Sequence, residues 1–131
     1  MLDLQQLSTG LISDSQLAAR VVAEVCGVYP ERNEVLVNAG TIALSKETSK
    51  FPGFGNVAEK DAWCVSRMSQ EHGILSVLEG KEGTAVDEVR IGDKISVLPA
   101  HSCITAAAFH VFYVVDEDDI VRETWVPWKG W

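Results

Sequence analysis

The sequence predicts a mainly β fold: a small β-barrel or a strongly bent antiparallel sheet, with one or two short helical segments. Apolar and polar residues alternate in several short runs, and clusters of turn-forming residues separate those runs. The chain has 131 residues, of which 47% are hydrophobic, which is enough for one globular domain with a core. No repeat or low-complexity tract divides it, so we expect a single β domain over residues 1–131.

The first strand is predicted within residues 19–27. Val21, Ala23 and Val25 alternate there with polar neighbours, a two-residue period typical of a half-buried strand. A helix is the competing interpretation, because Ser13 and Gln16 have capping-box spacing ahead of an apolar stretch. We favour a strand that is entered through a short helical turn.

The remaining elements follow the same logic of β-branched runs and turn residues. The turn formers at 30–33 join the first strand to a second one and so complete a hairpin. We expect strands at 34–37, 62–68, 73–78, 90–98, 111–115 and 120–126, an exposed loop at 45–56, turns at 79–83 and 116–119, and one helical turn at 105–109.

Charge and cysteine content exclude several classes of function. The chain has 11 basic and 19 acidic residues, a net charge of −8, which repels phosphate backbones and argues against nucleic-acid binding. No apolar run has the length of a membrane span, and no secretory signal is recognisable at the N-terminus. The three cysteines form no disulfide framework, so we expect a reducing, cytoplasmic location.

His101 and Cys103 are the candidate metal ligands. In an extended segment, two residues with one between them present their side chains on the same face, with Cα atoms about 6.6 Å apart. A thiolate beside an imidazole favours zinc over magnesium or calcium. Because a closed structural zinc site has four protein ligands, two ligands predict an open, catalytic type of site. Ser102 would point the other way, as a hydrogen-bonding neighbour. A buried thiol beside a partly exposed histidine is the alternative.

A second cluster lies in the run Ser69–Gly73. Glu71 and His72 are candidates for an acid–base pair or for lining an active site. They could also orient a metal ligand by hydrogen-bonding to it without touching the metal. A plain β-turn with Gly73 at positive φ explains the same residues equally well.

The C-terminal segment 125–131 contains three of the four tryptophans. A free, solvated tail does not usually carry so much aromatic surface. We therefore expect this segment to pack on the barrel or on a partner surface.

Several short runs occur in a recognisable order: Val37–Gly40 with Ala43–Ser45, Ser69–Gly73, Ile91–Asp93, Leu98–Cys103, Tyr113–Asp116 and the terminal Gly130–Trp131. Their order resembles the C-terminal domain of the D-serine dehydratase-like and D-threonine aldolase-like enzymes, which are pyridoxal-phosphate enzymes of the alanine-racemase fold type. The chain departs from the family pattern at Asn38, where aspartate is usual, and at Gln70, where glutamate is usual.

The resemblance implies that His101 and Cys103 hold zinc beside the cofactor. The aldolase branch tends to have aspartate in place of the cysteine, so Cys103 looks like the dehydratase branch. The implied reaction is β-elimination on a D-amino acid, with D-serine giving pyruvate and ammonia. Alternatives are a non-catalytic metal-binding or interaction module and a D-threonine aldolase-type domain. His72 and His110 are the next ligands to consider.

Enzymes of this family also carry an N-terminal (β/α)₈ barrel, whose lysine forms the Schiff base with pyridoxal phosphate. The 131-residue chain has about the length of the second domain alone, and its first dozen residues resemble the connection out of the barrel. The resemblance implies that this chain on its own is inactive and needs a cofactor-binding barrel, in cis or in trans. The dimeric habit of the family further implies a homodimer.

Overall fold

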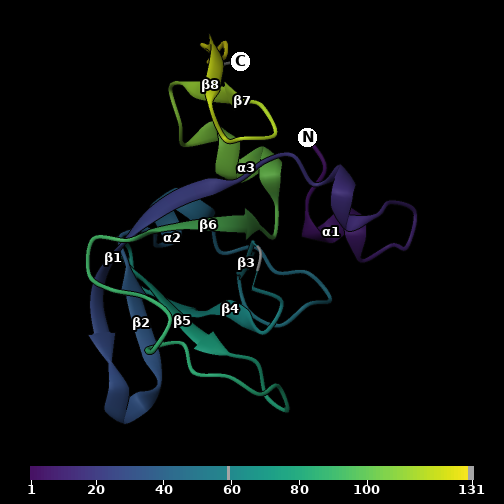
Figure 1. The fold of residues 1–131 in the computed structure, drawn as a ribbon. Coiled ribbons are helices and arrows are strands. Elements are labelled where there is room, and N and C mark those ends of the chain that lie inside the picture. Colours follow the sequence, from purple (N-terminus) through teal and green to yellow (C-terminus); the bar gives the residue numbers. More distant parts are fainter. Residues whose placement is uncertain (59, 130–131) are drawn as a thin grey trace.

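The computed structural model describes residues 1–58 and 60–129. Six antiparallel strands close into a barrel in the order β1-β2-β5-β4-β3-β6, which confirms the predicted fold class (Figure 1). The barrel strands are β1 (Val21–Tyr29), β2 (Glu34–Val37), β3 (Gly55–Val57), β4 (Trp63–Met68), β5 (Gly73–Val77) and β6 (Lys94–Pro99).

The barrel interior is built from β-branched and small side chains, as the alternation in the sequence predicts. In β1, Val21, Ala23 and Val25 are buried, while Val22 and Cys26 face solvent. Inward residues of the other strands complete the core; the buried set includes Val35, Val37, Val57, Trp63, Val65, Leu75, Ile95 and Val97. Each barrel strand pairs with two neighbours, so the sheet closes on itself.

The first hairpin forms as expected. A short helical turn, Asp14–Gln16, precedes β1, and a 3₁₀ turn, Pro30–Arg32, joins β1 to β2. Asn33 ends this turn in the left-handed conformation, with φ of 51°. Its side-chain oxygen accepts a hydrogen bond from the backbone N–H of Ala85 at 2.8 Å, which ties the turn to the long loop before β6.

Three short α-helices lie outside the barrel: α1 (Leu4–Leu7), α2 (Thr41–Leu44) and α3 (Ser102–Ala107). The first two are four residues long and were not predicted, because so short a segment has no helical periodicity to detect. In the described part of the chain, no helix combines the length and apolar character needed to cross a bilayer.

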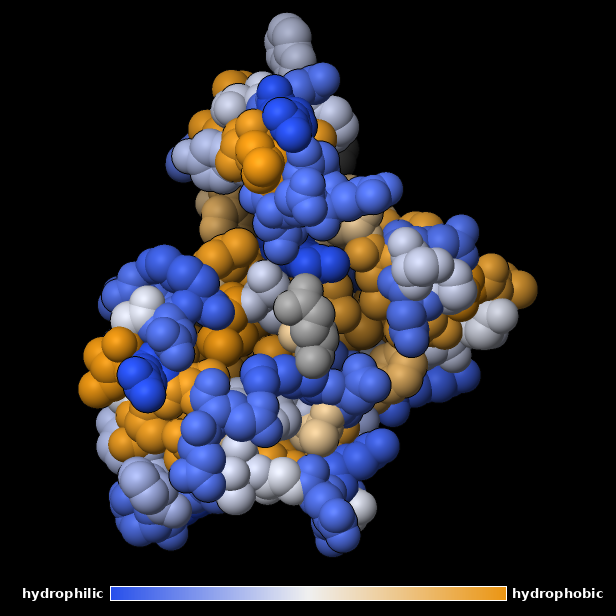
Figure 2. Space-filling model, viewed as in Figure 1, coloured by the Kyte–Doolittle hydropathy of each residue, from blue (hydrophilic) through white to orange (hydrophobic). Residues whose placement is uncertain are grey.

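A second hairpin, β7 (Phe112–Val115) with β8 (Val121–Trp125), projects beyond α3 as a separate two-stranded sheet (Figure 1). All residues of β8 are exposed, and apolar side chains are visible on this projection in Figure 2. Trp125 is 57% exposed and Trp128 is fully exposed. The expectation that the segment 125–131 packs on the barrel is therefore wrong for Trp125 and Trp128, while packing on a partner surface stays a prediction. Gly130 and Trp131 lie outside the described residues.

Two predicted boundaries were also wrong. The strand expected at 90–98 begins only at Lys94, because residues 90–93 form a turn in which Gly92 has a φ of 95°. The loop expected at 45–56 ends earlier, since β3 begins at Gly55. With only three residues, β3 is too short for a recognisable alternation, and its pairing with β4 and β6 stabilises it.

Candidate functional site

His101 and Cys103 lie at the start of α3, directly after the last barrel strand. β6 ends at Pro99, and His101 is the N-cap residue of α3 with extended backbone angles, φ of −134° and ψ of 101°. Cys103 belongs to the first turn of the helix. The predicted extended segment through both residues is therefore wrong. The helical turn expected at 105–109 is confirmed as a helix, but its bounds differ, since α3 begins at Ser102 and ends at Ala107. The alanine-rich stretch after Thr105 favours helix, and the helix extends back to Ser102.

The position of α3 is fixed by Ser102, the residue between the two candidate ligands. Its backbone N–H donates to Asp3 Oδ2 at 2.8 Å, and its hydroxyl lies 3.2 Å from the same oxygen and 2.9 Å from the carbonyl of Met1. Asp3 and Ser102 are 2% and 1% exposed. The expectation that Ser102 acts as a hydrogen-bonding neighbour is confirmed.

A second anchor holds the other side of α3. The hydroxyl of Thr105 is buried and donates to the carbonyl of Leu44, at the end of α2, over 3.0 Å. α2 and α3 are in direct contact. The N-terminal segment and α2 thus hold α3 from two directions.

His101 has an unusual environment. Its Nδ1 atom is enclosed by protein and has no hydrogen-bond partner, although the side chain as a whole is 26% exposed. The Glu47 carboxylate, in the loop after α2, lies 3.9 Å from Nδ1, which is too long for a hydrogen bond. A buried, unpaired ring nitrogen is costly and rare in a folded protein.

The three cysteines differ in accessibility. Cys103 and Cys26 are exposed free thiols, while Cys64 is buried on β4. Burial raises the pKa of the Cys64 thiol, which keeps it protonated and unreactive. Cys103 is thus an accessible sulfur two positions from His101 in the chain, and not a thiol sealed in the core.

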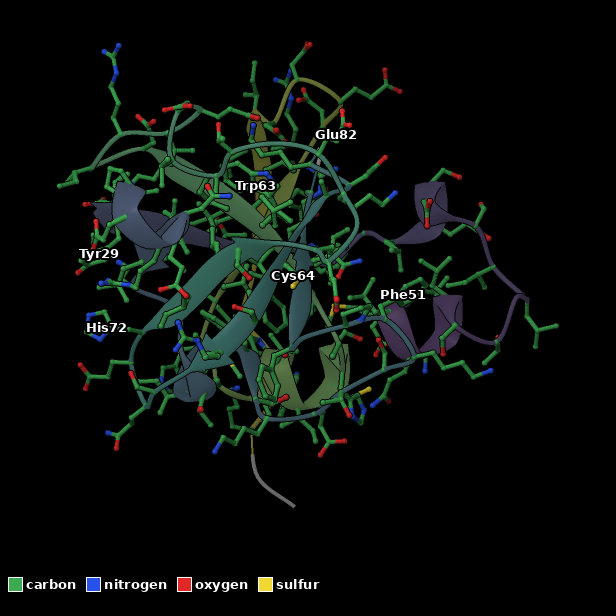
Figure 3. The ribbon with its side chains drawn as sticks, turned by 90° about the horizontal axis from the view of Figure 1, so that it is seen from below. Tyr29, Phe51, Trp63, Cys64, His72 and Glu82 are labelled. Carbon is green, nitrogen blue, oxygen red and sulfur yellow. The ribbon has the colours of Figure 1, made fainter. Side chains whose placement is uncertain are left out.

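Glu71 and His72 lie in the exposed turn between β4 and β5. In Figure 3, His72 lies at the outer edge of the molecule, while α3 lies nearer the centre. The backbone of His72 exchanges hydrogen bonds with Ser69, so the residue closes a tight turn. The structure does not bring His72 to the two candidate ligands.

The turn at Ser69–His72 packs on the start of α2. The backbone N–H groups of Thr41 and Ile42 donate to the carbonyls of Ser69 and Gln70 at 3.0 and 3.1 Å. Gly73 does not have positive φ, so that interpretation of the glycine is wrong. A Cβ on Gly73 would instead lie 2.5 Å from the carbonyl oxygen of Ala39.

His110 follows α3 and is exposed. Among residues 1–58 and 60–129, no three His, Cys, Asp or Glu side chains are grouped closely enough to hold a metal ion. The described residues therefore supply at most two metal ligands, His101 and Cys103. A metal held by them would take its remaining ligands from other molecules or from another part of the protein.

Known proteins are similar in sequence to most or all of this chain. Residues 18–115 match the model of the family described as "Putative serine dehydratase domain". The chain is 46% identical to D-serine dehydratase of Schizosaccharomyces pombe over 137 residues and 38% identical to that of Saccharomyces cerevisiae over 141 residues. Each alignment covers 100% of this chain and 32% of the relative, so the chain spans about a third of the length of these curated relatives.

A solved structure shares the whole fold. D-threo-3-hydroxyaspartate dehydratase from Delftia sp. HT23 superposes with a TM-score of 0.88 at 26% identity, over 100% of this chain and 37% of that one. Two variant structures of D-threo-3-hydroxyaspartate dehydratase carry alanine in place of a histidine and, in a metal-free form, in place of a cysteine two positions further along.

Proposed function

Because the chain belongs to the serine dehydratase domain family, we propose that it forms the metal-holding part of a pyridoxal-phosphate- and zinc-dependent D-amino-acid lyase, with D-serine as substrate. The products would be pyruvate and ammonia. Support for the substrate comes from the two D-serine dehydratase relatives, which are also the most similar in sequence among those described above.

The residues at the start of α3 fit a zinc ion. His101 offers an imidazole nitrogen, and Cys103 offers an accessible thiol that zinc binds as thiolate. The observation that carries the proposal is the accessible Cys103 thiol two positions after His101, at the start of a helix that Asp3 and Ser102 hold in place. The histidine and cysteine substituted in the variant dehydratase structures have the same spacing as His101 and Cys103.

When bound, pyridoxal phosphate supplies an electron sink for the α-carbon, and zinc supplies a Lewis acid for the departing β-hydroxyl. In this proposal His101 and Cys103 bind the metal at the end of the barrel. Cys103 Sγ gives up its proton as it becomes a ligand. Ser102 and Asp3 fix the backbone between the two ligands, so that both ligand side chains are attached to a rigid segment.

The chain contributes one side of an active site. We propose that a pyridoxal-phosphate-binding barrel, in cis or in trans, supplies the Schiff-base lysine, since the curated relatives are about three times as long as this chain. A homodimer and a cytoplasmic location remain part of the proposal. The acidic balance, −8 overall, is compatible with a small-molecule substrate and unfavourable for nucleic acid.

The test uses the assembled enzyme and D-serine, with pyruvate as the measured product. We expect His101→Ala and Cys103→Ala each to abolish elimination while the absorbance of the bound cofactor stays intact. Cys26→Ala is the matched control, because this thiol is exposed on β1 and should be dispensable. Full turnover by either ligand variant would contradict the metal assignment.

Two other substrates separate the alternatives. Faster elimination from D-threo-3-hydroxyaspartate than from D-serine would move the assignment toward the Delftia relative. Glycine and acetaldehyde from D-threonine, without pyruvate from D-serine, would favour the retro-aldol alternative. Pyruvate formed by this chain alone with added cofactor would refute the need for a barrel.

A further inference from the structure

We propose that Glu47 is a positioning residue for His101: its carboxylate accepts the Nδ1–H hydrogen bond and thereby leaves Nε2 as the metal-binding nitrogen. This inference rests on the proposed function, because it assigns a role within the same zinc site.

The first support is the state of the two atoms. His101 Nδ1 is enclosed and unpaired, and the Glu47 Oε2 atom is 3.9 Å away. A hydrogen bond between them would need a distance of about 2.9 Å, so the carboxylate has to approach by about 1 Å. The Glu47 side chain is 48% exposed and free to change rotamer, whereas His101 is largely enclosed. We therefore expect the Glu47 side chain, and not His101, to move.

The second support is the loop that presents Glu47. Its backbone N–H donates to the hydroxyl of Ser45 at 3.2 Å. The next residue, Thr48, accepts a hydrogen bond from the Gln5 side chain at 2.9 Å. At the other end, Leu44 accepts the buried Thr105 hydroxyl bond from α3. The loop is thus attached both to the N-terminal segment and to α3 itself.

The third support is chemical. A histidine that binds a metal through one ring nitrogen donates the other N–H to a carboxylate, carbonyl or water, which fixes its tautomer and orientation. The Glu47–His101 pair matches that pattern once the carboxylate has approached Nδ1 to hydrogen-bond distance. Removing such a partner typically lowers metal affinity by about 10–100-fold.

The zinc arm of the test uses the full 131-residue chain. Zinc binding is measured as protection of the Cys103 thiol from iodoacetamide, read by peptide mass spectrometry over a zinc titration. We expect Glu47→Ala to raise the zinc concentration needed for protection by about 10–100-fold. Glu47→Gln keeps an acceptor oxygen and should need a zinc concentration between those of the wild type and Glu47→Ala. Glu82→Ala removes the same charge from an exposed site in the loop after β5 and should match the wild type.

The second arm needs no metal. Nitrogen-15 NMR of the His101 ring in the metal-free chain reports which nitrogen carries the proton. We expect the Nδ1–H tautomer in the wild type and in Glu47→Gln, and a mixture in Glu47→Ala. The same tautomer in wild type and Glu47→Ala would overturn the inference, as would a zinc titration unchanged by Glu47→Ala. If the wild-type chain binds no zinc, the metal assignment fails, and the tautomer alone still decides the role of Glu47.

Discussion

Asp3 accepts a hydrogen bond from the backbone N–H of Ser102 at 2.8 Å, although the two residues are 99 positions apart in the chain. The other carboxylate oxygen of Asp3 accepts the N–H of Gln6 at 3.1 Å and caps α1. One buried carboxylate therefore joins the N-terminal segment to the helix that carries Cys103. The N-terminal segment and the start of α3 form a single structural unit.

Asp3→Ala should destabilise the chain by about 1–3 kcal/mol, because it leaves the buried Ser102 N–H without an acceptor. Urea unfolding followed by circular dichroism gives the free energy of unfolding. Asp118→Ala, at an exposed turn position, is the control and should have little effect. Equal stability of the Asp3 variant and the control would contradict the anchoring role.

The Asp3–Ser102 contact is an example of a feature that the sequence could not predict. The hairpin β1–β2 and the barrel class follow from local patterns, since alternation and the turn at Pro30–Arg32 each lie within a few residues. The pair His101 and Cys103 was likewise visible as a short motif. Contacts over 99 or 61 residues, such as Asp3–Ser102 and Leu44–Thr105, depend on barrel closure and leave no local signal. Glu47 was missed for the same reason, because it lies in an ordinary polar loop.

The cysteines should react with alkylating reagents according to their burial. In the native, metal-free chain, Cys26 and Cys103 should be modified and Cys64 should resist, because burial both shields its thiol and raises its pKa. Peptide mass spectrometry after brief iodoacetamide treatment measures this. In urea all three should react. Rapid native labelling of Cys64, or protection of Cys103 without metal, would contradict the accessibility described here.

Gly40→Ala should loosen the contact between α2 and the turn before β5. A Cβ at Gly40 would lie 2.6–2.7 Å from backbone atoms of Ser69, Gln70 and His72, so we expect a loss of about 1–3 kcal/mol. Hydrogen exchange at the N–H groups of Thr41 and Ile42 should accelerate, since both donate into that turn. In Glu82→Ala, at an exposed position in the loop after β5, those two amides should be unaffected. Unchanged exchange in the Gly40 variant would contradict the docking of these segments.

The hairpin β7–β8 should weaken in acid. The backbone N–H of Ile120 hydrogen-bonds to the Asp116 carboxylate and lowers its pKa below the ordinary value of 3.8, with Arg122 and Asp118 adding to the effect. A lowered pKa in the folded state means that the carboxylate stabilises the hairpin above about pH 3.8 and that this contribution is lost as the pH falls through the lowered value. The protection of the Ile120 amide, measured as its exchange rate relative to that of an unstructured peptide at the same pH, should therefore decrease there.

Asp116→Asn separates this effect from general acid unfolding. The amide oxygen still accepts hydrogen bonds from Ile120 and Asp118 but cannot be protonated in this range. The acid-dependent step in Ile120 exchange should disappear in this variant. A step of the same size in Asp116→Asn would assign it to another group.

Cobalt(II) titration of the chain tests the central claim, that His101 and Cys103 hold one divalent metal, most directly. Cobalt replaces zinc in such sites and gives a thiolate charge-transfer absorption. We expect this absorption in the wild type and in Cys26→Ser, its loss in Cys103→Ser, and a weaker affinity in His101→Ala. Absorption that survives in Cys103→Ser, or an affinity untouched by His101→Ala, would contradict the account.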